Sequence, residues 1–353
     1  MRCYISSQWP REALPRCKPW RARERIPSSF PISCRKAVHT TTRRLRSVAV
    51  PNRKLSSRVP DSTMAKKALD INSTYRMNSG YEIPVLGFGV YQTPASEACS
   101  LVEHAIQVGY RHVDSAVVYR NEQSSAAGLR CAGIPRSELF FTSKVPPRQM
   151  NHAGATACIN ETLRITGLDY IDLYLLHAPY GGKEGRLGAW KALAEAVEQG
   201  KVRSIGVSNF GVHHLNELEG FIKQVEALEG EGKGGILSVN QVELHPWLAR
   251  KDIVEWCQRR GVLLEAYSPL VRGQRMDDPL LRSLMKKHNK TAAQILLRWS
   301  LQKEFIPLPK SVTPSRIEQN AAIFDFELDV KDMQRLYTED YAPCTWDPTV
   351  SRD

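Results

Sequence analysis

Residues 170–178 read YIDLYLLHA, a short apolar run that ends beside the ionisable side chain of His177. Two earlier runs have the same form: residues 112–116 read HVDSA and contain Asp114, and residues 139–145 read LFFTSKV and contain Lys144. Short runs rich in Val, Ile, Leu and Phe are typical of parallel strands that are covered on both faces. An ionisable residue at the exit of such a strand is costly to bury unless it is paired or used. These runs therefore predict a parallel sheet with a functional site at one edge.

The same pattern continues along the chain, because strand-like runs alternate with amphipathic, helix-like segments from residue 85 onward. Strands are expected at residues 85–91, 112–116, 139–145, 170–178, 204–209, 237–243, 263–268 and 305–309. Helices are expected among others at residues 96–108, 189–199 and 291–301, the last with Thr291 as its N-cap. Eight strand–helix units in about 250 residues match an α/β fold of the (β/α)8 TIM-barrel type better than an open doubly wound sheet.

The segments around this repeat complete the predicted architecture. Gly87-Phe88-Gly89 is only a GxG, and no third glycine opens a helix after it, so the dinucleotide-binding fingerprint of open sheets is missing. Residues 74–76 and 82–84 flank Asn78-Ser79-Gly80, which is a hairpin signal. We expect this N-terminal β-hairpin to close the barrel floor. The turn-rich C-terminal tail, residues 341–348, is expected to wrap over one end of the barrel as a loop.

Charge divides the chain into two parts. Residues 1–63 hold 15 of the 49 basic residues but only 3 of the 37 acidic ones, so they carry the whole net charge of +12. The remainder is balanced, which excludes a general nucleic-acid-binding field. We predict a disordered basic N-terminal extension at 1–63 and a barrel domain at 64–353. The extension resembles an organelle transit peptide, but its prolines favour the alternative that it precedes a natural start at Met64 and is absent from the mature protein.

The cysteines and the apolar runs bear on compartment and partners. The eight cysteines include no CxxC and no metal-binding spacing, which indicates a reducing compartment and no metal site. No apolar stretch is long enough to span a bilayer. The sequence therefore predicts a cytoplasmic protein with no membrane partner. A mitochondrial location stays open if residues 1–63 are a transit peptide.

Four polar residues follow neighbouring strands of the predicted barrel: Asp114, Tyr119, Lys144 and His177. The carboxyl ends of barrel strands converge on one face, so these side chains are expected to meet. A nearby lysine lowers the pKa of a tyrosine, which makes it a better proton donor, and an aspartate can hold that lysine in place. The histidine can orient a carbonyl oxygen. Taken singly, each residue has a structural alternative: an ion pair, a packed aromatic ring or a core histidine.

Five motifs in order resemble the aldo-keto reductases: GYRHVDSAVVYRNE, FFTSKV, YIDLYLLHAP, IGVSNF and LPKSVTPSRIEQN. The resemblance runs from about Tyr75 to the C-terminus. It implies a (β/α)8 barrel that reduces aldehydes or ketones reversibly to alcohols with NADPH. It also implies that Asp114, Tyr119, Lys144 and His177 form the catalytic tetrad, with Tyr119 as the general acid.

The resemblance extends to the cofactor. The implied NADPH contacts are Ser208, Asn209 and Gln241 at the nicotinamide carboxamide, Tyr267 against the nicotinamide ring, Ser268 and Leu270 near the pyrophosphate, Lys310, Ser311, Val312 and Arg316 at the 2′-phosphate, and Gln319 and Asn320 at the adenine. Lys310 and Arg316 suit a dianionic phosphate, and they favour NADPH over NADH. Ser315 is expected to cap the helix that carries Arg316.

Two positions depart from the family pattern and bear on the substrate pocket. Ala178 stands where relatives often carry a tryptophan, which would enlarge the pocket. Val90 stands where they often carry Thr or Ser, so one polar cofactor contact would be missing. The pocket walls are expected to include Tyr91, Ala178 and Trp247, and also Val117, Tyr180 and Trp346.

Three functions compete at this stage. The first is reduction of a small-molecule carbonyl substrate by a monomer. The second is a non-catalytic NADPH-binding regulatory barrel. The third is a Schiff-base aldolase that uses Lys144.

Overall fold

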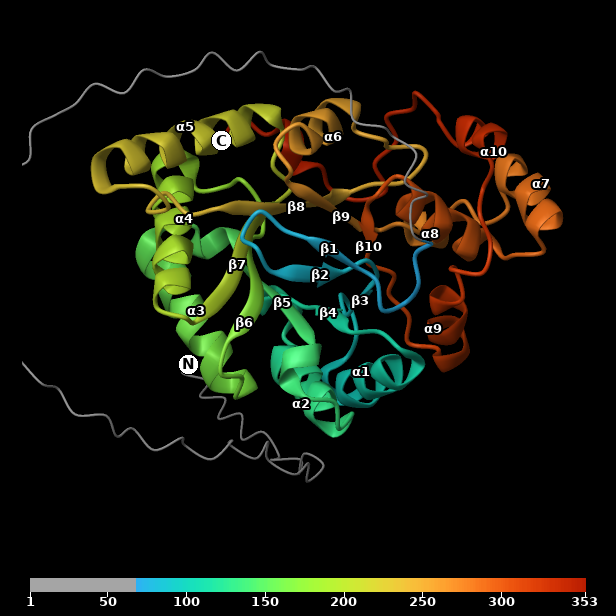
Figure 1. Ribbon diagram of the computed structural model, residues 1–353, viewed down its shortest axis with the longest axis horizontal. Helices are drawn as coiled ribbons and strands as arrows, with labels where there is room; N and C mark the ends of the chain where they lie inside the picture. The colour runs from blue at the N-terminus through green and yellow to red at the C-terminus, as the bar shows by residue number, and fades with distance from the viewer. Residues whose placement is uncertain (1–67) are drawn as a thin grey trace, which may run out of the picture. The chain divides into compact units, whose positions relative to one another are not determined.

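A computed structural model describes residues 68–353, which form a parallel sheet rolled into a barrel with helices around it (Figure 1). The predicted extension at 1–63 lies outside the described residues. The sheet contains β3 (Gly87–Gly89), β4 (His112–Asp114), β5 (Phe140–Val145), β6 (Ile171–Leu176), β7 (Val202–Ser208), β8 (Leu237–Glu243), β9 (Leu263–Tyr267) and β10 (Ile306–Pro307), each paired with its sequence neighbour. The predicted (β/α)8 barrel is therefore confirmed, and each expected strand contains or overlaps an observed one.

The helices alternate with the strands as expected. They are α1 (Ala95–Val108), α2 (Glu122–Cys131), α3 (His152–Thr166), α4 (Gly182–Glu198), α5 (Val212–Glu229), α6 (Lys251–Gln258), α7 (Pro279–His288), α8 (Ala292–Gln302), α9 (Pro314–Ala321) and α10 (Val330–Arg335). Thr291 caps α8, and its side chain accepts a hydrogen bond from the Gln294 backbone N–H, as predicted.

Helix α4 begins at Gly182, seven residues before its predicted start at residue 189. The glycines in residues 182–188 lower helix propensity, so the local sequence favours a loop there. Tertiary contacts override this preference because the buried guanidinium of Arg186 donates to Pro179 O at 2.7 Å and pairs with Glu217 at 3.0 Å.

The barrel is nearly closed where β3 meets β10. The backbone N–H of Gly89 donates to Pro309 O at 3.0 Å across this seam. A Cβ atom at Gly87 would overlap the Leu308 side chain and lie 2.8 Å from His112 Nδ1. The two strands can approach this closely because residue 87 has no side chain.

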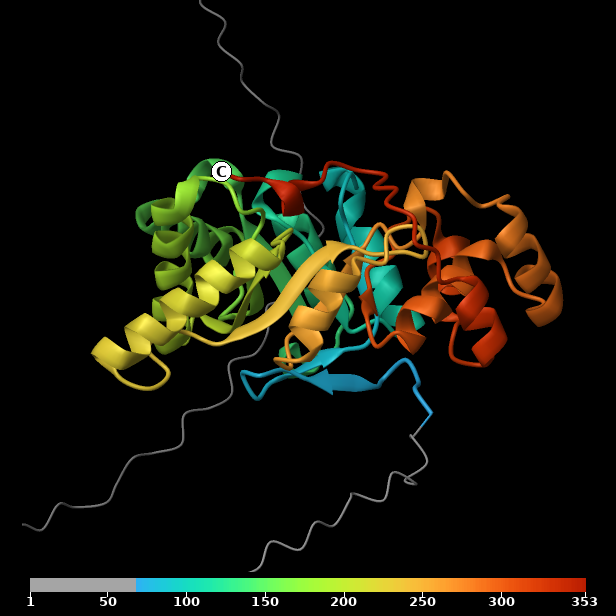
Figure 2. The same ribbon diagram turned by 90° about the horizontal axis from the view of Figure 1, so that it is seen from above.

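The hairpin and the tail lie at opposite ends of the barrel (Figure 2). Strands β1 (Thr74–Arg76) and β2 (Glu82–Pro84) pair antiparallel, and Met77 and Ile83 pack into the apolar core. That core also contains Phe140, Leu173, Leu175, Val239, Ile306 and Leu308. The predicted closure of the barrel floor by a hairpin is therefore confirmed.

The C-terminal tail lies over the other end, as expected. Its residue Ala342 donates a backbone hydrogen bond to Trp247 O at 3.0 Å, and Tyr341 forms a β-bridge with Leu248. Arg250 holds the tail further along, through Thr349 Oγ1 at 2.7 Å and Asp347 Oδ1 at 3.0 Å. Within residues 68–353, no helix combines the length and apolarity needed to cross a bilayer.

Candidate active site

Lys144 and Asp114 form a buried ion pair at the carboxyl ends of β5 and β4. The Lys144 ammonium lies 2.8 Å from each Asp114 carboxylate oxygen and 2.7 Å from Ser115 O. Lys144 is fully buried and Asp114 is 4 % exposed. The pair is therefore rigidly held, and its orientation follows from the parallel pairing of β4 with β5, in which Asp114 lies opposite Thr142.

Tyr119 and His177 complete the group. Tyr119 ends the short 3₁₀ helix η1 (Val117–Tyr119), and its hydroxyl lies 3.4 Å from Lys144 Nζ. The His177 ring lies just past β6 and meets the Tyr119 ring edge-on, with 5.7 Å between the ring centroids. The structure thus brings together all four residues that the sequence singled out, and Tyr91 joins them with its ring 5.1 Å from Tyr119.

The electrostatics of Tyr119 differ from the sequence-based expectation. Burial, and then the negative charge of Asp114, raise the pKa of Tyr119 well above its usual value, whereas Lys144 was expected to lower it. Burial is the main reason. The Lys144 ammonium lies 3.4 Å from the Tyr119 hydroxyl, but it is also bound by both oxygens of Asp114, whose negative charge opposes ionisation of the phenol.

The His177 imidazole is uncharged at neutral pH. Burial, and then the charge of Lys144, lower the pKa of His177 to about 3. Its Nδ1 atom is buried without a hydrogen-bond partner within the part of the chain that the structure describes. A neutral imidazole beside the Tyr119 ring can donate a hydrogen bond to a carbonyl oxygen without transferring its own proton.

Four of the predicted nicotinamide contacts form one hydrogen-bonded group. Tyr267 donates through its hydroxyl to Asn209 Oδ1 at 2.8 Å, and Asn209 Nδ2 donates to His177 O at 2.9 Å. Ser208 Oγ donates to Gln241 O at 2.8 Å. Gln241 Oε1 accepts no hydrogen bond from the described residues, so it remains available to an amide such as the nicotinamide carboxamide. These polar groups therefore fit the nicotinamide end of a dinucleotide cofactor.

The predicted 2′-phosphate segment lies after β10 and on α9. Lys310 is half-buried, whereas Val312, Arg316 and Gln319 are exposed and Ser311 and Asn320 are buried. Neither Lys310 nor Arg316 forms an ion pair with an acidic residue among residues 68–353. Two uncompensated cations on one short segment fit a dianionic phosphate.

The sequence prediction that Ser315 caps α9 is wrong, because Thr313 is the N-cap residue and Ser315 lies inside the helix.

The loop predicted to contact the pyrophosphate has unusual backbone geometry. Ser268, the residue after β9, has φ +49°, and Leu270 precedes the 3₁₀ helix η4 (Val271–Gly273). Val271 and Arg272 also have positive φ. Three non-glycine residues with positive φ within five positions are costly, and such residues cluster at ligand-binding loops in proteins generally.

The predicted pocket residues are placed differently from one another. Tyr91 is 51 % exposed at the mouth of the site, and Ala178 is fully buried directly after His177. Trp247 is only 3 % exposed, and the Arg275 guanidinium lies over its ring, 4.9 Å from the ring centroid. Val117 and Tyr180 are half-buried, and the Tyr180 ring lies 5.7 Å from that of the tail residue Trp346. The tail therefore reaches the same end of the barrel as Asp114, Tyr119, Lys144 and His177.

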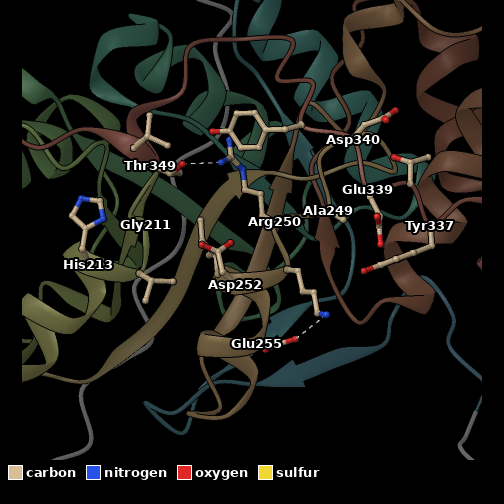
Figure 3. A pocket seen from close by; sticks show the side chains of 16 residues that line it. Gly211, His213, Ala249, Arg250, Asp252, Glu255, Tyr337, Glu339, Asp340 and Thr349 are labelled. Carbon is tan, nitrogen blue, oxygen red and sulfur yellow. Dashed lines mark hydrogen bonds and ion pairs between the residues drawn. The ribbon is translucent and has the colours of Figure 1, made fainter.

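A cavity of 680 Å³ lies outside this site, between the N-terminal ends of α5 and α6 and the tail (Figure 3). None of the four strand-end residues lines it. Arg250, Asp252 and Tyr341 do, and the guanidinium of Arg250 is already bound to the tail. We assign it no ligand.

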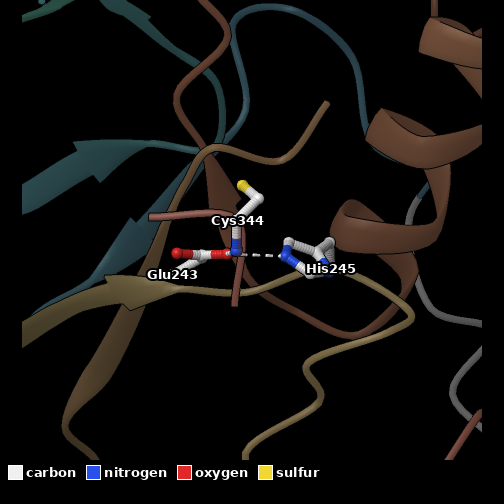
Figure 4. A group of neighbouring side chains, drawn as sticks. All are labelled: Glu243, His245 and Cys344. Atoms are coloured by element: carbon white, nitrogen blue, oxygen red, sulfur yellow. Dashed lines mark hydrogen bonds and ion pairs between the residues drawn. The ribbon is translucent and has the colours of Figure 1, made fainter. Parts of the chain in front are cut away.

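One group that the sequence analysis did not identify joins the barrel to the tail: the buried residues Glu243 and His245 and the half-buried tail residue Cys344 (Figure 4). Their potential metal-ligating atoms lie within 4.8 Å of one another. The carboxylate of Glu243 already accepts hydrogen bonds from His245 Nε2 at 2.8 Å, from the Cys344 backbone N–H at 2.6 Å and from the Thr345 hydroxyl. These contacts make Glu243 the anchor of the tail. That the chain has no metal site stays a prediction. Glu243 ends β8, so the strand-end pattern could have revealed it.

The fold is a (β/α)8 barrel in which Asp114, Tyr119, Lys144 and His177 lie together at the carboxyl ends of the strands. Residues 85–338 match the model of the Aldo/keto reductase family. The chain therefore belongs to the aldo/keto reductase family of oxidoreductases.

Relatives and solved structures agree with this assignment. The glyoxal reductase of Bacillus subtilis (strain 168) is 41% identical over 267 residues, which cover 75% of this chain and 92% of that protein. An uncharacterized oxidoreductase of Schizosaccharomyces pombe is 40% identical over 80% of this chain and 99% of its own length. The crystal structure of an aldo/keto reductase from Brucella melitensis, 36% identical, superposes with a TM-score of 0.70 over 76% of this chain and 98% of that one.

Proposed function

We propose that this protein reduces an aldehyde or ketone to the alcohol with NADPH, with Tyr119 as the general acid. The observation that carries the proposal is the arrangement around its hydroxyl. The Lys144 ammonium lies 3.4 Å from that oxygen, and the His177 ring stands edge-on beside the phenol. This is the geometry needed to deliver a proton to a carbonyl oxygen that has become negative.

Each residue has a distinct part in the proposed reaction. Tyr119 carries its proton at neutral pH, and because burial raises the pKa of the phenol, the charge of the phenolate must be stabilised for the proton to leave. As the proton leaves, the phenolate forms beside Lys144, which Asp114 holds in place. Neutral His177 orients the substrate oxygen. Bound NADPH supplies the hydride.

The choice of cofactor rests on charge. Lys310 and Arg316 form no ion pair in the described part of the chain, and the 2′-phosphate that distinguishes NADPH from NADH would supply the missing negative charge. Tyr267, Asn209 and Gln241 would hold the nicotinamide end.

The geometry disfavours the aldolase alternative. A Schiff-base lysine attacks as a neutral amine. Lys144 instead has four oxygen atoms within hydrogen-bond distance, at Asp114, Ser115 and Tyr119, and these suit an ammonium donor. The regulatory-barrel alternative requires NADPH binding without turnover, so the experiment below separates it from the proposal.

The test is NADPH consumption over a panel of carbonyl substrates. Glyoxal and other small dicarbonyls head the panel, because the Bacillus subtilis relative is a glyoxal reductase. Tyr119→Phe is expected to lower kcat by about 100-fold or more while NADPH still binds. Tyr174→Phe is the matched control, since this buried hydroxyl bonds Thr162 on the outer side of β6. Turnover by the Tyr119 variant at the wild-type rate would refute the role of Tyr119, and NADPH binding without any wild-type turnover would favour the regulatory barrel.

A further inference from the structure

A second layer of buried polar side chains lies inside the barrel next to the catalytic group. Glu265 on β9 and His112 on β4 are both fully buried. His112 Nε2 lies 2.9 Å from Thr142 Oγ1 and 3.6 Å from Glu265 Oε1. Barrel interiors are normally filled with branched apolar side chains. A carboxyl group in this position is costly and requires an explanation.

Gln241 connects this layer to the catalytic ion pair. Its side-chain amide nitrogen donates to Asp114 Oδ1 at 2.9 Å and to Glu265 Oε2 at 2.8 Å. The link follows from the pairing of β8 with β9, in which Gln241 and Glu265 lie opposite each other. A single nitrogen atom, Gln241 Nε2, therefore links Glu265 to the Asp114 carboxylate that binds Lys144.

The charges in this region do not balance if Glu265 is ionised. The ionisable groups facing it are His112 and Asp114 from β4, Lys144 from β5 and Tyr119 from η1. The single ammonium, on Lys144, is already bound by both Asp114 oxygens. Glu265 Oε1 has no hydrogen-bond partner, and no Lys or Arg of residues 68–353 pairs with this carboxyl.

Glu265 is better suited than His112 to carry the proton that would balance the charge. Burial, and then the charge of Lys144, lower the pKa of His112 to about 3, so this ring is neutral. Burial, and then the charge of Asp114, raise the pKa of Glu265. A protonated Glu265 leaves Lys144 and Asp114 as a neutral pair beside the phenol of Tyr119.

We propose that Glu265 is a positioning residue that controls how readily Tyr119 gives up its proton. While Glu265 is protonated, one ammonium faces one carboxylate, and the phenol can ionise with the least repulsion. Once Glu265 loses its proton, a second negative charge enters the dry interior and Tyr119 holds its proton more tightly. The catalytic consequence rests on the proposed function, whereas the electrostatic link between the two residues does not.

The electrostatic link is tested by NMR on the full chain without cofactor. Carbon-13 labels on the glutamate carboxyls and on the tyrosine Cζ atoms report both residues, assigned with Glu265→Gln and Tyr119→Phe. We expect the Glu265 carboxyl to titrate well above the ordinary glutamate range and the Tyr119 signal to move at the same pH. A Glu265 carboxyl that titrates near about 4.3, or a Tyr119 signal that ignores it, would overturn the proposal.

Two variants separate electrostatics from structure. Glu265→Gln keeps the size of the side chain and an acceptor for the Gln241 amide, and it should abolish the coupled movement of the Tyr119 signal. Glu265→Asp keeps a titrating group and should retain that movement, so the proposal stays testable if the first variant folds poorly. Glu122→Gln is the matched control: this buried carboxylate bonds Ser143 and Thr162 on the outer side of β5. It should leave the coupled movement in place, and loss of that movement in the control would overturn the assignment to Glu265.

The catalytic consequence is tested by the pH dependence of kcat for carbonyl reduction. The wild-type rate should fall by roughly threefold to tenfold as Glu265 ionises, because Tyr119 becomes a weaker acid. Glu265→Gln should lack this step, with KM for the carbonyl unchanged. Identical profiles for wild type and variant would refute the catalytic consequence. If the wild type reduces no carbonyl at all, the proposed function fails, and the NMR titration alone decides the link.

Discussion

Removal of Lys310 or Arg316 gives a direct test of the cofactor assignment. Both cations lie on the segment from β10 into α9, and neither has an acidic partner in residues 68–353. A hydrogen bond to a charged group contributes about 1.5–3 kcal/mol, and solvent screening of the exposed Arg316 reduces this to about 1–2 kcal/mol. Each alanine substitution should therefore weaken NADPH binding by roughly 5- to 30-fold. NADH lacks the 2′-phosphate, so its affinity should not change.

The assay is quenching of tryptophan fluorescence in titrations with each dinucleotide at one fixed ionic strength, because salt screens these contacts. Arg282→Ala is the matched control. Arg282 is an exposed cation on α7 that forms no ion pair within residues 68–353. Equal losses for NADPH and NADH, or unchanged NADPH affinity in both the Lys310 and the Arg316 variants, would refute the reasoning.

Three further predictions concern the barrel and its tail. Gly87→Ala should lower the free energy of unfolding, measured in urea titrations, by about 1–3 kcal/mol because the new methyl group overlaps Leu308. Gly220→Ala should raise it by about 0.5–1 kcal/mol, because Gly220 lies in the interior of α5 and a methyl group there would meet no other atom. Burial by itself raises the pKa of Glu243, but hydrogen bonds from His245, Thr345 and Cys344 outweigh it and lower that pKa to about 2. The ionised Glu243 therefore stabilises the fold above the ordinary glutamate pKa, and this contribution to the free energy of unfolding is lost as pH falls toward 2. In Glu243→Gln, the free energy of unfolding should fall less over this pH range than in the wild type, by an amount on the order of 2 kcal/mol. An unchanged dependence on pH would contradict the anchor role. If Ala178 forms part of the pocket wall, as the sequence predicts, Ala178→Trp should lower kcat/KM for bulky ketones more than for small aldehydes. Equal losses for both would contradict that prediction.

Most residues of the candidate site could be predicted from their positions at the ends of the expected strands. Asp114, Lys144 and His177 each stand at the exit of an apolar run, and parallel strands carry such residues to one edge of a barrel. Tyr119 follows from the same logic because η1 comes directly after β4. These placements are local in sequence, so the pattern of apolar and polar residues was sufficient to predict them.

Other features depend on residues that are distant in sequence. The early start of α4 depends on contacts that Arg186 makes beyond its own helix, with Pro179 and Glu217. The anchor of the tail joins Glu243 to residues about a hundred positions later. No pattern within a single strand or helix carries this information.

The sequence by itself determined the kind of fold, the order of its strands and the polar residues at their exits, because the period of apolar residues and the direction of parallel strands suffice for that. Only the tertiary structure decided the charge balance around Tyr119. Whether a lysine lowers the pKa of a tyrosine depends on what else the lysine touches, and Lys144 is held by both oxygens of Asp114. The side-chain amide of Gln241 on β8 then joins Asp114 on β4 to Glu265 on β9, although β4 is not a neighbour of β8 or β9 in the sheet. Burial and distance set these interactions, and both exist only once the barrel has formed.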